Sequence, residues 1–169
     1  MDQGVVQFLS GPSLKLPLYW QAVGHETKNT ENYRFYGQKR PYLKLLWQVT
    51  LSGTGMLQVA NNRPVTLPKG ASFLAQFPSD HVYYYSREFS HWEFAYVILS
   101  GPAMPELLTS IRHRPLIVFN RDLSTALEDK LLEMVETYRS GISDPWRCMG
   151  EAAEILASLL KEAHLNEDR

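Results

Sequence analysis

The chain has 169 residues, 44% of them hydrophobic, which suits one globular domain with a substantial core and argues against disorder. Its formal net charge is −1 and its 17 Lys and Arg residues are scattered, which argues against a chain that binds nucleic acid by itself. The single cysteine, Cys148, excludes an internal disulfide framework and a cysteine-rich zinc site.

The first part of the chain predicts an arm followed by strands. Residues 1–17 carry glycines and prolines and are expected to form an N-terminal arm with little regular structure. Strands are expected at 18–26 and 33–39, with a polar loop between them. Over 43–51, apolar and polar residues alternate with the period of a half-buried strand. Further strands are expected at 56–60, 64–67, 71–76, 81–86 and 92–99.

Turn-forming residues separate these expected strands. Gly53-Thr54-Gly55 and Asn61-Asn62 are able to supply the positive φ that a hairpin turn needs. Several short strands with turns between them predict an all-β sandwich or barrel. Aromatic residues gather in the same region and must either fill the barrel or line a pocket in it. They are Trp47, Phe73, Phe77, Tyr83, Tyr84, Tyr85, Phe89, Trp92, Phe94 and Tyr96.

After Pro102 the apolar residues recur with a helical period. Residues 103–113 are expected to form a short helix, followed by an extended piece at 116–119. Apolar helical faces then recur over 123–138 and 149–163. Because only about five residues separate these two helices, we expect them to pack as antiparallel neighbours.

The two helices carry start signals and a surplus of apolar surface. Asp122 and Asp144 are the expected N-caps. Two consecutive apolar faces exceed what one side of a small barrel needs, so we expect a homodimer through residues 123–163. Packing of the helices on their own barrel alone is the alternative. The residues expected at the dimer interface are Leu127, Leu131, Met134, Met149, Leu156 and Leu159.

Four segments carry a resemblance to a known family. They are Leu51-Ser52-Gly53-Thr54-Gly55; Leu67-Pro68-Lys69-Gly70; Phe77-Pro78-Ser79-Asp80-His81; and His91-Trp92-Glu93-Phe94 leading to Ser100-Gly101-Pro102. In order and spacing they resemble the N-terminal effector-binding domain of AraC-type bacterial transcriptional regulators. The resemblance covers roughly residues 18–112. It implies a mainly β fold with α: a cupin-like double-stranded β-helix barrel at 18–119, followed by an antiparallel helix pair within a helical dimerisation segment at 120–169.

The resemblance also implies a function. Such regulators bind a small effector, often a sugar, inside the barrel, dimerise through the following helices, and contact DNA through a C-terminal domain with two helix-turn-helix units. After Leu165 only four residues remain, whereas that domain needs roughly 100. We therefore expect a non-enzymatic sensor domain excised from its DNA-binding domain, with a natural single-domain relative as the alternative. The sequence has no signal-peptide pattern and no membrane-spanning run, so we expect a cytoplasmic protein without a membrane partner.

One strand face supplies the first ligand-binding candidates. Trp92, Phe94, Tyr96 and Ile98 share this face, and the resemblance places it inside the barrel. An aromatic wall for a sugar ring and a filled aromatic core are both consistent with the pattern. The core is expected for Phe94 and Ile98, whereas the question stays open for Trp92 and Tyr96, which each carry a donor.

Other candidates follow from the resemblance. Family residues at the positions of His81 and Tyr83 lie by the effector pocket, and Tyr84 should point outwards. Arg40 matches an arginine that touches the sugar in the arabinose-responsive member, with a solvated arginine as the alternative. Trp47 is a candidate for which core packing is the alternative. The ligand-binding candidates are therefore Arg40, Trp47, His81, Tyr83, Trp92 and Tyr96.

A metal site is not expected. Many cupin enzymes hold a metal with a His-x-His pair, a glutamate and a later histidine. The strand from Trp47 to Leu51 has neither histidine nor carboxylate, and Glu93 should face away from His81. We expect no cofactor and no catalytic residues. A metal-dependent cupin enzyme such as a sugar isomerase is the alternative function, and a purely structural dimerisation module is a third.

Overall fold

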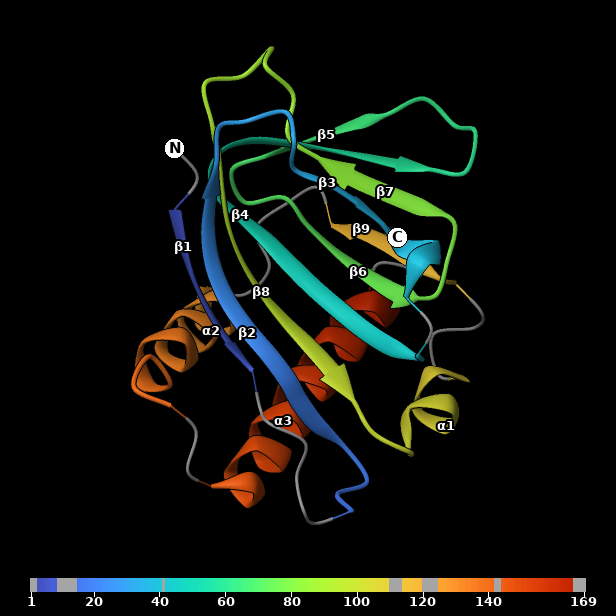
Figure 1. Ribbon diagram of the computed structural model, residues 1–169. Coiled ribbons are helices and arrows are strands. Elements are labelled where there is room, and N and C mark those ends of the chain that lie inside the picture. The colour runs from blue at the N-terminus through green and yellow to red at the C-terminus, as the bar shows by residue number, and fades with distance from the viewer. Residues whose placement is uncertain are drawn as a thin grey trace.

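The computed structural model describes residues 3–8, 15–40, 42–109, 114–119, 125–141 and 144–165. Within them the chain forms an antiparallel β-barrel flanked by helices (Figure 1). The strands are β1 (Gln3–Phe8), β2 (Tyr19–Lys28), β3 (Arg34–Tyr36), β4 (Lys44–Val59), β5 (Val65–Pro68), β6 (Ser72–Phe77), β7 (His81–Tyr84), β8 (Trp92–Ser100) and β9 (Leu116–Phe119). The helices are the 3₁₀ turn η1 (Gly37–Lys39), α1 (Met104–Leu108), α2 (Thr125–Thr137) and α3 (Pro145–Leu165). The expected mainly β fold, a barrel followed by an antiparallel helix pair, is confirmed.

Two sheets close the barrel, and β4 belongs to both. The first sheet has the order β1-β2-β8-β4-β6-β9, and the second joins β5, β4, β7 and β3. The prediction of a hairpin turn at 53–55 is wrong, because β4 continues through these residues as one strand. Gly53 has a φ of 70° and lies beside a register shift, and the next backbone N–H, of Thr54, donates to the carbonyl of His91 at 3.1 Å. The positive φ therefore serves a bend that carries β4 from one sheet into the other.

The first sheet separates two cores, because its side chains alternate between two faces. On β4, Leu45 and Trp47 face the helices, whereas Leu46 and Gln48 face the barrel interior. The expected core role of Phe94 is confirmed, and Phe73 and Phe77 also fill the barrel rather than line a pocket, since all three are buried inside it. We call the interior set the barrel core; it comprises Leu46, Leu57, Leu67, Ala71, Phe73, Ala75, Phe77, Tyr83, Tyr85, Trp92 and Phe94. The helix-side core includes Trp20, Val23, Leu45, Trp47, Val49, Leu74, Ala95, Val97 and Leu99 from the strands.

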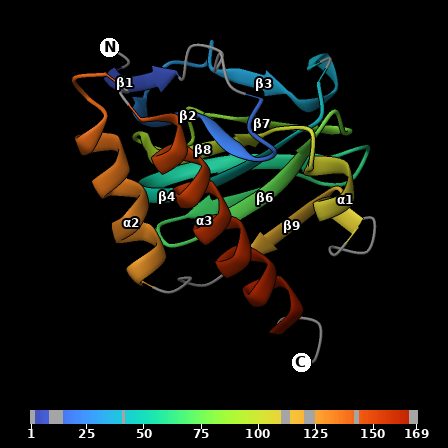
Figure 2. The ribbon, with the colours of Figure 1, turned by 90° about the horizontal axis from the view of Figure 1, so that it is seen from below.

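Helices α2 and α3 lie side by side in antiparallel directions against the outer face of the first sheet (Figure 2). Five of the six residues expected at a dimer interface are buried here, within the chain itself: Leu127, Leu131, Met134, Leu156 and Leu159. Assigning them to a dimer interface was therefore wrong. The outer face of the first sheet is apolar, and the helices cover it with these side chains. The sixth residue, Met149, is only partly buried.

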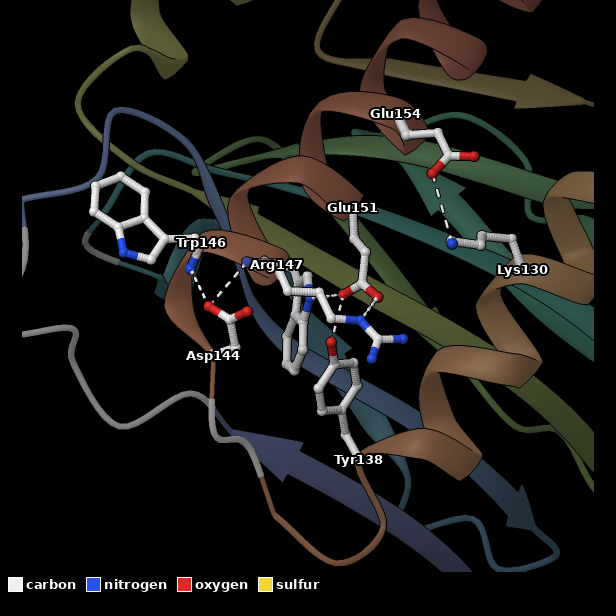
Figure 3. A network of polar contacts seen from close by, with 8 residues as sticks. Lys130, Tyr138, Asp144, Trp146, Arg147, Glu151 and Glu154 are labelled. Carbon is white, nitrogen blue, oxygen red and sulfur yellow. Dashed lines mark hydrogen bonds and ion pairs between the residues drawn. The ribbon is translucent and has the colours of Figure 1, made fainter.

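A buried carboxylate attaches the helix pair to the sheet (Figure 3). Glu151 of α3 is 6% exposed, and its Oε2 accepts hydrogen bonds from Trp20 Nε1 at 2.9 Å and from the Tyr138 hydroxyl at 2.8 Å. Its Oε1 accepts a third bond, from Arg147 Nε at 3.1 Å. Burial, and after it the hydrogen bond to Glu151, raises the pKa of Tyr138, so the phenol remains a donor. The network ties β2, the end of α2 and the start of α3 together.

The N-terminal arm differs from expectation, and one of the two expected helix caps is confirmed. Residues 3–8 form strand β1 along β2, where little regular structure was expected in the arm. The expected cap Asp144 is confirmed, since its Oδ1 accepts bonds from the backbone N–H groups of Trp146 and Arg147 (Figure 3). The other expected cap, Asp122, lies outside the described residues. Within the described ranges, no helix combines the length and apolarity needed to cross a bilayer.

Candidate ligand-binding site

The barrel interior contains a pocket of about 320 Å³ between the two sheets. Side chains of β2, β4 and β8 form one wall, in which Leu46 lies opposite Ile98 and Gln48 opposite Tyr96. Side chains of β3, β7 and the adjoining loops form the other wall. The lining residues are Glu26, Tyr33, Phe35, Arg40, Leu46, Gln48, Tyr83, Tyr96 and Ile98.

Aromatic rings build the second wall. Phe35 stacks on Tyr83 with centroids 4.9 Å apart and an interplanar angle of 13°. Tyr33 lies 6.3 Å from Tyr83 and 5.6 Å from Phe94, centroid to centroid. The guanidinium of Arg40 lies over the Phe35 ring at 4.3 Å. The rings of this wall therefore pack against one another within the chain itself.

Tyr96 crosses the opposite wall through a gap left by a glycine. A Cβ atom at Gly24, its neighbour on β2, would lie 2.5 Å from Tyr96 Cζ. The missing side chain lets the phenol reach along β2, where its hydroxyl donates to the Glu26 carboxylate. Lys28 Nζ forms an ion pair with the same carboxylate. Burial and the nearby Glu26 charge raise the pKa of Tyr96, so its hydroxyl stays protonated.

The other two phenols of the pocket are also neutral donors. Burial, above all, raises the pKa of Tyr33 and Tyr83 well above their ordinary value. The positive charge of Arg40 acts on both groups in the opposite direction, but more weakly. Each therefore presents a hydroxyl that can donate one hydrogen bond and accept others.

Among the lining residues, Gln48 carries a buried polar atom that has no partner. Its side chain is 2% exposed and lines the pocket, and its Nε2 has no hydrogen-bond partner among the described residues. A buried donor without a partner costs about 1–3 kcal/mol. An acceptor atom of a ligand in the pocket would remove that cost.

Of the six candidates from the sequence, Arg40, Tyr83 and Tyr96 come together at the pocket. Trp47 does not, and its placement as a ligand-binding residue was wrong. It lies on the opposite face of β4, fully buried in the helix-side core, because odd-numbered residues of this part of the strand face the helices.

Trp92 points into the barrel but does not line the pocket. Its ring packs over Gly55, where a Cβ would lie 2.1 Å from Cε2, and its Nε1 donates to Thr50 Oγ1 at 3.1 Å. Its donor is thus satisfied within the barrel core. The expected outward direction of Tyr84 is confirmed by the guanidinium of Arg34, which lies 4.1 Å over its ring.

His81 lies behind the aromatic wall rather than in it. Its ring stacks on Phe77 at 5.4 Å and on Tyr83 at 6.1 Å. The Ser79 hydroxyl donates to the Gln76 carbonyl, so its oxygen accepts the bond from His81 Nδ1 at 2.7 Å. Burial lowers the pKa of His81 to about 4, and the ring is neutral at pH 7. Its place suggests support for Tyr83 rather than contact with a ligand in this pocket.

Sequence reasoning missed Glu26, Tyr33, Phe35, Leu46 and Gln48 as lining residues, and Ile98, expected in the core, also lines the pocket. A signal was present for Gln48, because it lies on the other face of the strand from Leu45, Trp47 and Val49. Nothing local marked Glu26, Tyr33 and Phe35, since they come from β2, β3 and the loop between them, distant in sequence from the aromatic-rich region.

The donor set of the pocket does not match a metal centre. The carboxylate that lines it, Glu26, is engaged by Lys28 and Tyr96. Across the part of the chain that the structure describes, no three His, Cys, Asp or Glu side chains converge as metal ligands.

The barrel and the helix pair define the fold as mainly β: a cupin-like barrel followed by an antiparallel helix pair. No family model and no curated protein sequence matches the chain. Among solved structures, it is similar to the AraC-like transcriptional activator CuxR, with a TM-score of 0.57 and 14% identity over 95% of this chain and 61% of that chain. ToxT from Vibrio cholerae O395 follows with a TM-score of 0.45, 14% identity and coverage of 98% and 55%. A Cupin 2 conserved barrel domain protein from Salinispora arenicola CNS-205 has a TM-score of 0.40 and 14% identity, over 66% of this chain and 83% of that chain. The chain thus spans about three fifths of the activator's length.

Proposed function

We propose that this chain is the ligand-sensing domain of an AraC-type transcriptional regulator and that it is not an enzyme. It binds one small polar effector, such as a sugar or a sugar acid, in the barrel pocket. It acts in the cytoplasm, and DNA is contacted through a domain outside this chain. The fold shared with the AraC-like activator supports the regulatory context.

The observation that carries the proposal is the unmatched amide of Gln48 in a preformed pocket of about 320 Å³. A protein whose barrel served only as a scaffold would gain by filling this space with side chains. Instead, stacked rings form one wall and polar groups converge on the space, which is the composition of a small-molecule site. The apolar faces of a ring would pack on Phe35 and Tyr83, while its polar substituents meet Gln48 and the phenols.

A ligand screen tests this function. Thermal-shift measurements against sugars, sugar acids and small aromatic acids should find compounds that stabilise the chain. Calorimetry should then show binding about tenfold weaker for Gln48→Leu, because a buried hydrogen bond is lost. The matched control is Gln58→Leu on the same strand, since Gln58 lies outside the pocket. Equal affinities for the two variants, or no stabilising compound in these classes, would argue against the pocket as the sensor.

The chain also forms a homodimer in this proposal, through a different helix face from the one first expected. Along the outer side of α3, Gly150, Ala153 and Ala157 are exposed, flanked by the partly exposed Met149. Trp146 stands at the start of this face with 58% of its surface exposed. Small side chains allow two helices to approach closely, and an exposed tryptophan is a frequent anchor of interfaces.

A further inference from the structure

The volume of the pocket accommodates the ring of a monocyclic ligand. A volume of about 320 Å³ lies at the lower end of the range for small-molecule sites. It equals the space of roughly ten water molecules in the liquid. One six-membered ring with its substituents fits this volume.

The charges around the pocket do not cancel. The negative charge of Glu26 is matched by Lys28. Arg40 lines the pocket from an exposed position, and no carboxylate among the described residues forms an ion pair with its guanidinium. Lys44 lies on the inward face of β4 together with Leu46, and its pKa is lowered first by burial and then by the positive charge of Arg40. Two cations thus act on each other at this end of the barrel without a compensating acid.

Hydrogen-bond donors also outnumber free acceptors. Gln48 Nε2 has no described partner, and the Arg40 guanidinium has five N–H groups. Tyr33 and Tyr83 are protonated phenols. The one carboxylate of the lining, Glu26, is already engaged. A ligand that matches this site must therefore bring acceptor atoms and negative charge.

We infer that the ligand is a monocyclic carboxylic acid whose carboxylate is bound by Arg40. This inference rests on the proposed sensor function and specifies its ligand class. The planar guanidinium forms paired hydrogen bonds with both oxygens of a carboxylate, and the charges reinforce them. The ring lies against Phe35 and Tyr83, and a further acceptor of the ring meets Gln48. Aromatic acids and sugar acids share this chemistry.

Matched pairs of acid and neutral compound test the inference. Calorimetry compares 4-hydroxybenzoate with 4-hydroxybenzyl alcohol, and glucuronate with glucose, so that one pair has an aromatic ring and the other a saturated one. In at least one pair the acid should bind about tenfold more tightly than its neutral partner. The pair that shows the preference identifies the ring type.

Variants of Arg40 test whether this residue causes the preference for the acid over the neutral compound. Arg40→Gln should abolish the preference for the acid, and Arg40→Lys should retain part of it because the charge remains but the fork is lost. The control is Arg34→Gln, whose guanidinium lies over Tyr84 on the outer surface and should leave the preference unchanged. Circular dichroism establishes that each variant is folded.

The experiment distinguishes a failure of the acid inference from a failure of the proposed sensor function. If the neutral compounds bind as tightly as the acids, or if Arg40→Gln keeps the preference, the acid inference is overturned while the sensor function stands. If no member of either pair binds the wild-type chain, both the inference and the pocket's proposed function are overturned for single-ring ligands.

Discussion

The shape of the pocket depends on the absence of a side chain at Gly24. At Gly24 the ring of Tyr96 occupies the space that a side chain would take, with Cζ 2.5 Å from an ideal Cβ. The glycine thereby allows the phenol to reach Glu26 and sets one wall of the pocket. The shape of the site is therefore encoded partly by a residue that has no side chain.

Gly24→Ala should displace Tyr96 and deform the pocket. We expect a loss of about 1–3 kcal/mol in the free energy of unfolding, as for other overpacked positions, together with loss of ligand binding. Urea denaturation and calorimetry measure the two effects. Gly150→Ala on α3 is the control, because its added Cβ meets nothing within 4 Å and should stabilise the helix by up to about 1 kcal/mol. A Gly24→Ala protein as stable as the wild type would contradict the assigned packing.

His81 makes the stability of the fold depend on pH. Burial lowers its pKa from 6.5 to about 4, so the unfolded chain binds a proton over a range where the folded chain does not. The stability is therefore fully present above pH 6.5 and is lost as the pH falls towards 4. Between pH 7 and pH 5 the loss from this residue amounts to about 2 kcal/mol.

Denaturation at these two pH values checks the effect of His81. His81→Asn should lose less stability between pH 7 and pH 5 than the wild type does. His164→Asn, at an exposed position near the end of α3, should retain the wild-type difference. The same pH dependence in all three proteins would show that His81 does not titrate as its burial requires.

At the scale of elements, local patterns predicted most strands and helices. Alternation identified the first part of β4, and turn residues between apolar segments marked the other expected strands. Helical spacing identified α2 and α3, because one face of each is apolar. The continuity of β4 through Gly53 was not predictable, since the same glycine pattern serves a hairpin or a bend. The choice depends on the carbonyl of His91, about forty residues away along the chain.

The Glu151 network is the main polar attachment of α3. Glu151→Ala would leave the buried donors of Trp20 and Tyr138 without their acceptor, and we expect a loss of about 2–4 kcal/mol in unfolding free energy. Glu154→Ala, on the same helix, removes only an ion pair with Lys130 at 3.6 Å and should cost less than about 1 kcal/mol. Urea denaturation of both variants measures the difference. Similar losses would mean that the buried network is no stronger than the exposed pair.

For the molecule as a whole, the proposed dimer should depend on the outer face of α3. Ala153→Arg places a long charged side chain in the middle of that face and should give a monomer in sedimentation equilibrium. Ala126→Arg on the exposed side of α2 is the control and should remain dimeric. A wild-type chain that is monomeric at high micromolar concentration, or a dimeric Ala153→Arg protein, would contradict this interface.

The candidate site was predictable only in part, because it is assembled across the whole barrel. Arg40, Tyr83 and Tyr96 were identified through family resemblance and strand-face alternation. Trp47 was assigned to the wrong face, because alternation along a strand shows that its residues lie on two faces but does not show which face points into the barrel. Both faces of β4 are buried here, one by the helices and one by the barrel, so burial itself could not discriminate.

The alternation along β4 has a consequence for signalling between the two sides of the first sheet. Gln48 lines the pocket, and its chain neighbours Trp47 and Val49 pack under the helices. A ligand that shifts the backbone at Gln48 therefore moves helix-side side chains directly, without a relay of intervening residues. The path from the pocket to the helices is the thickness of one β-sheet, and the outer face of α3, where the dimer is proposed, lies one helix further.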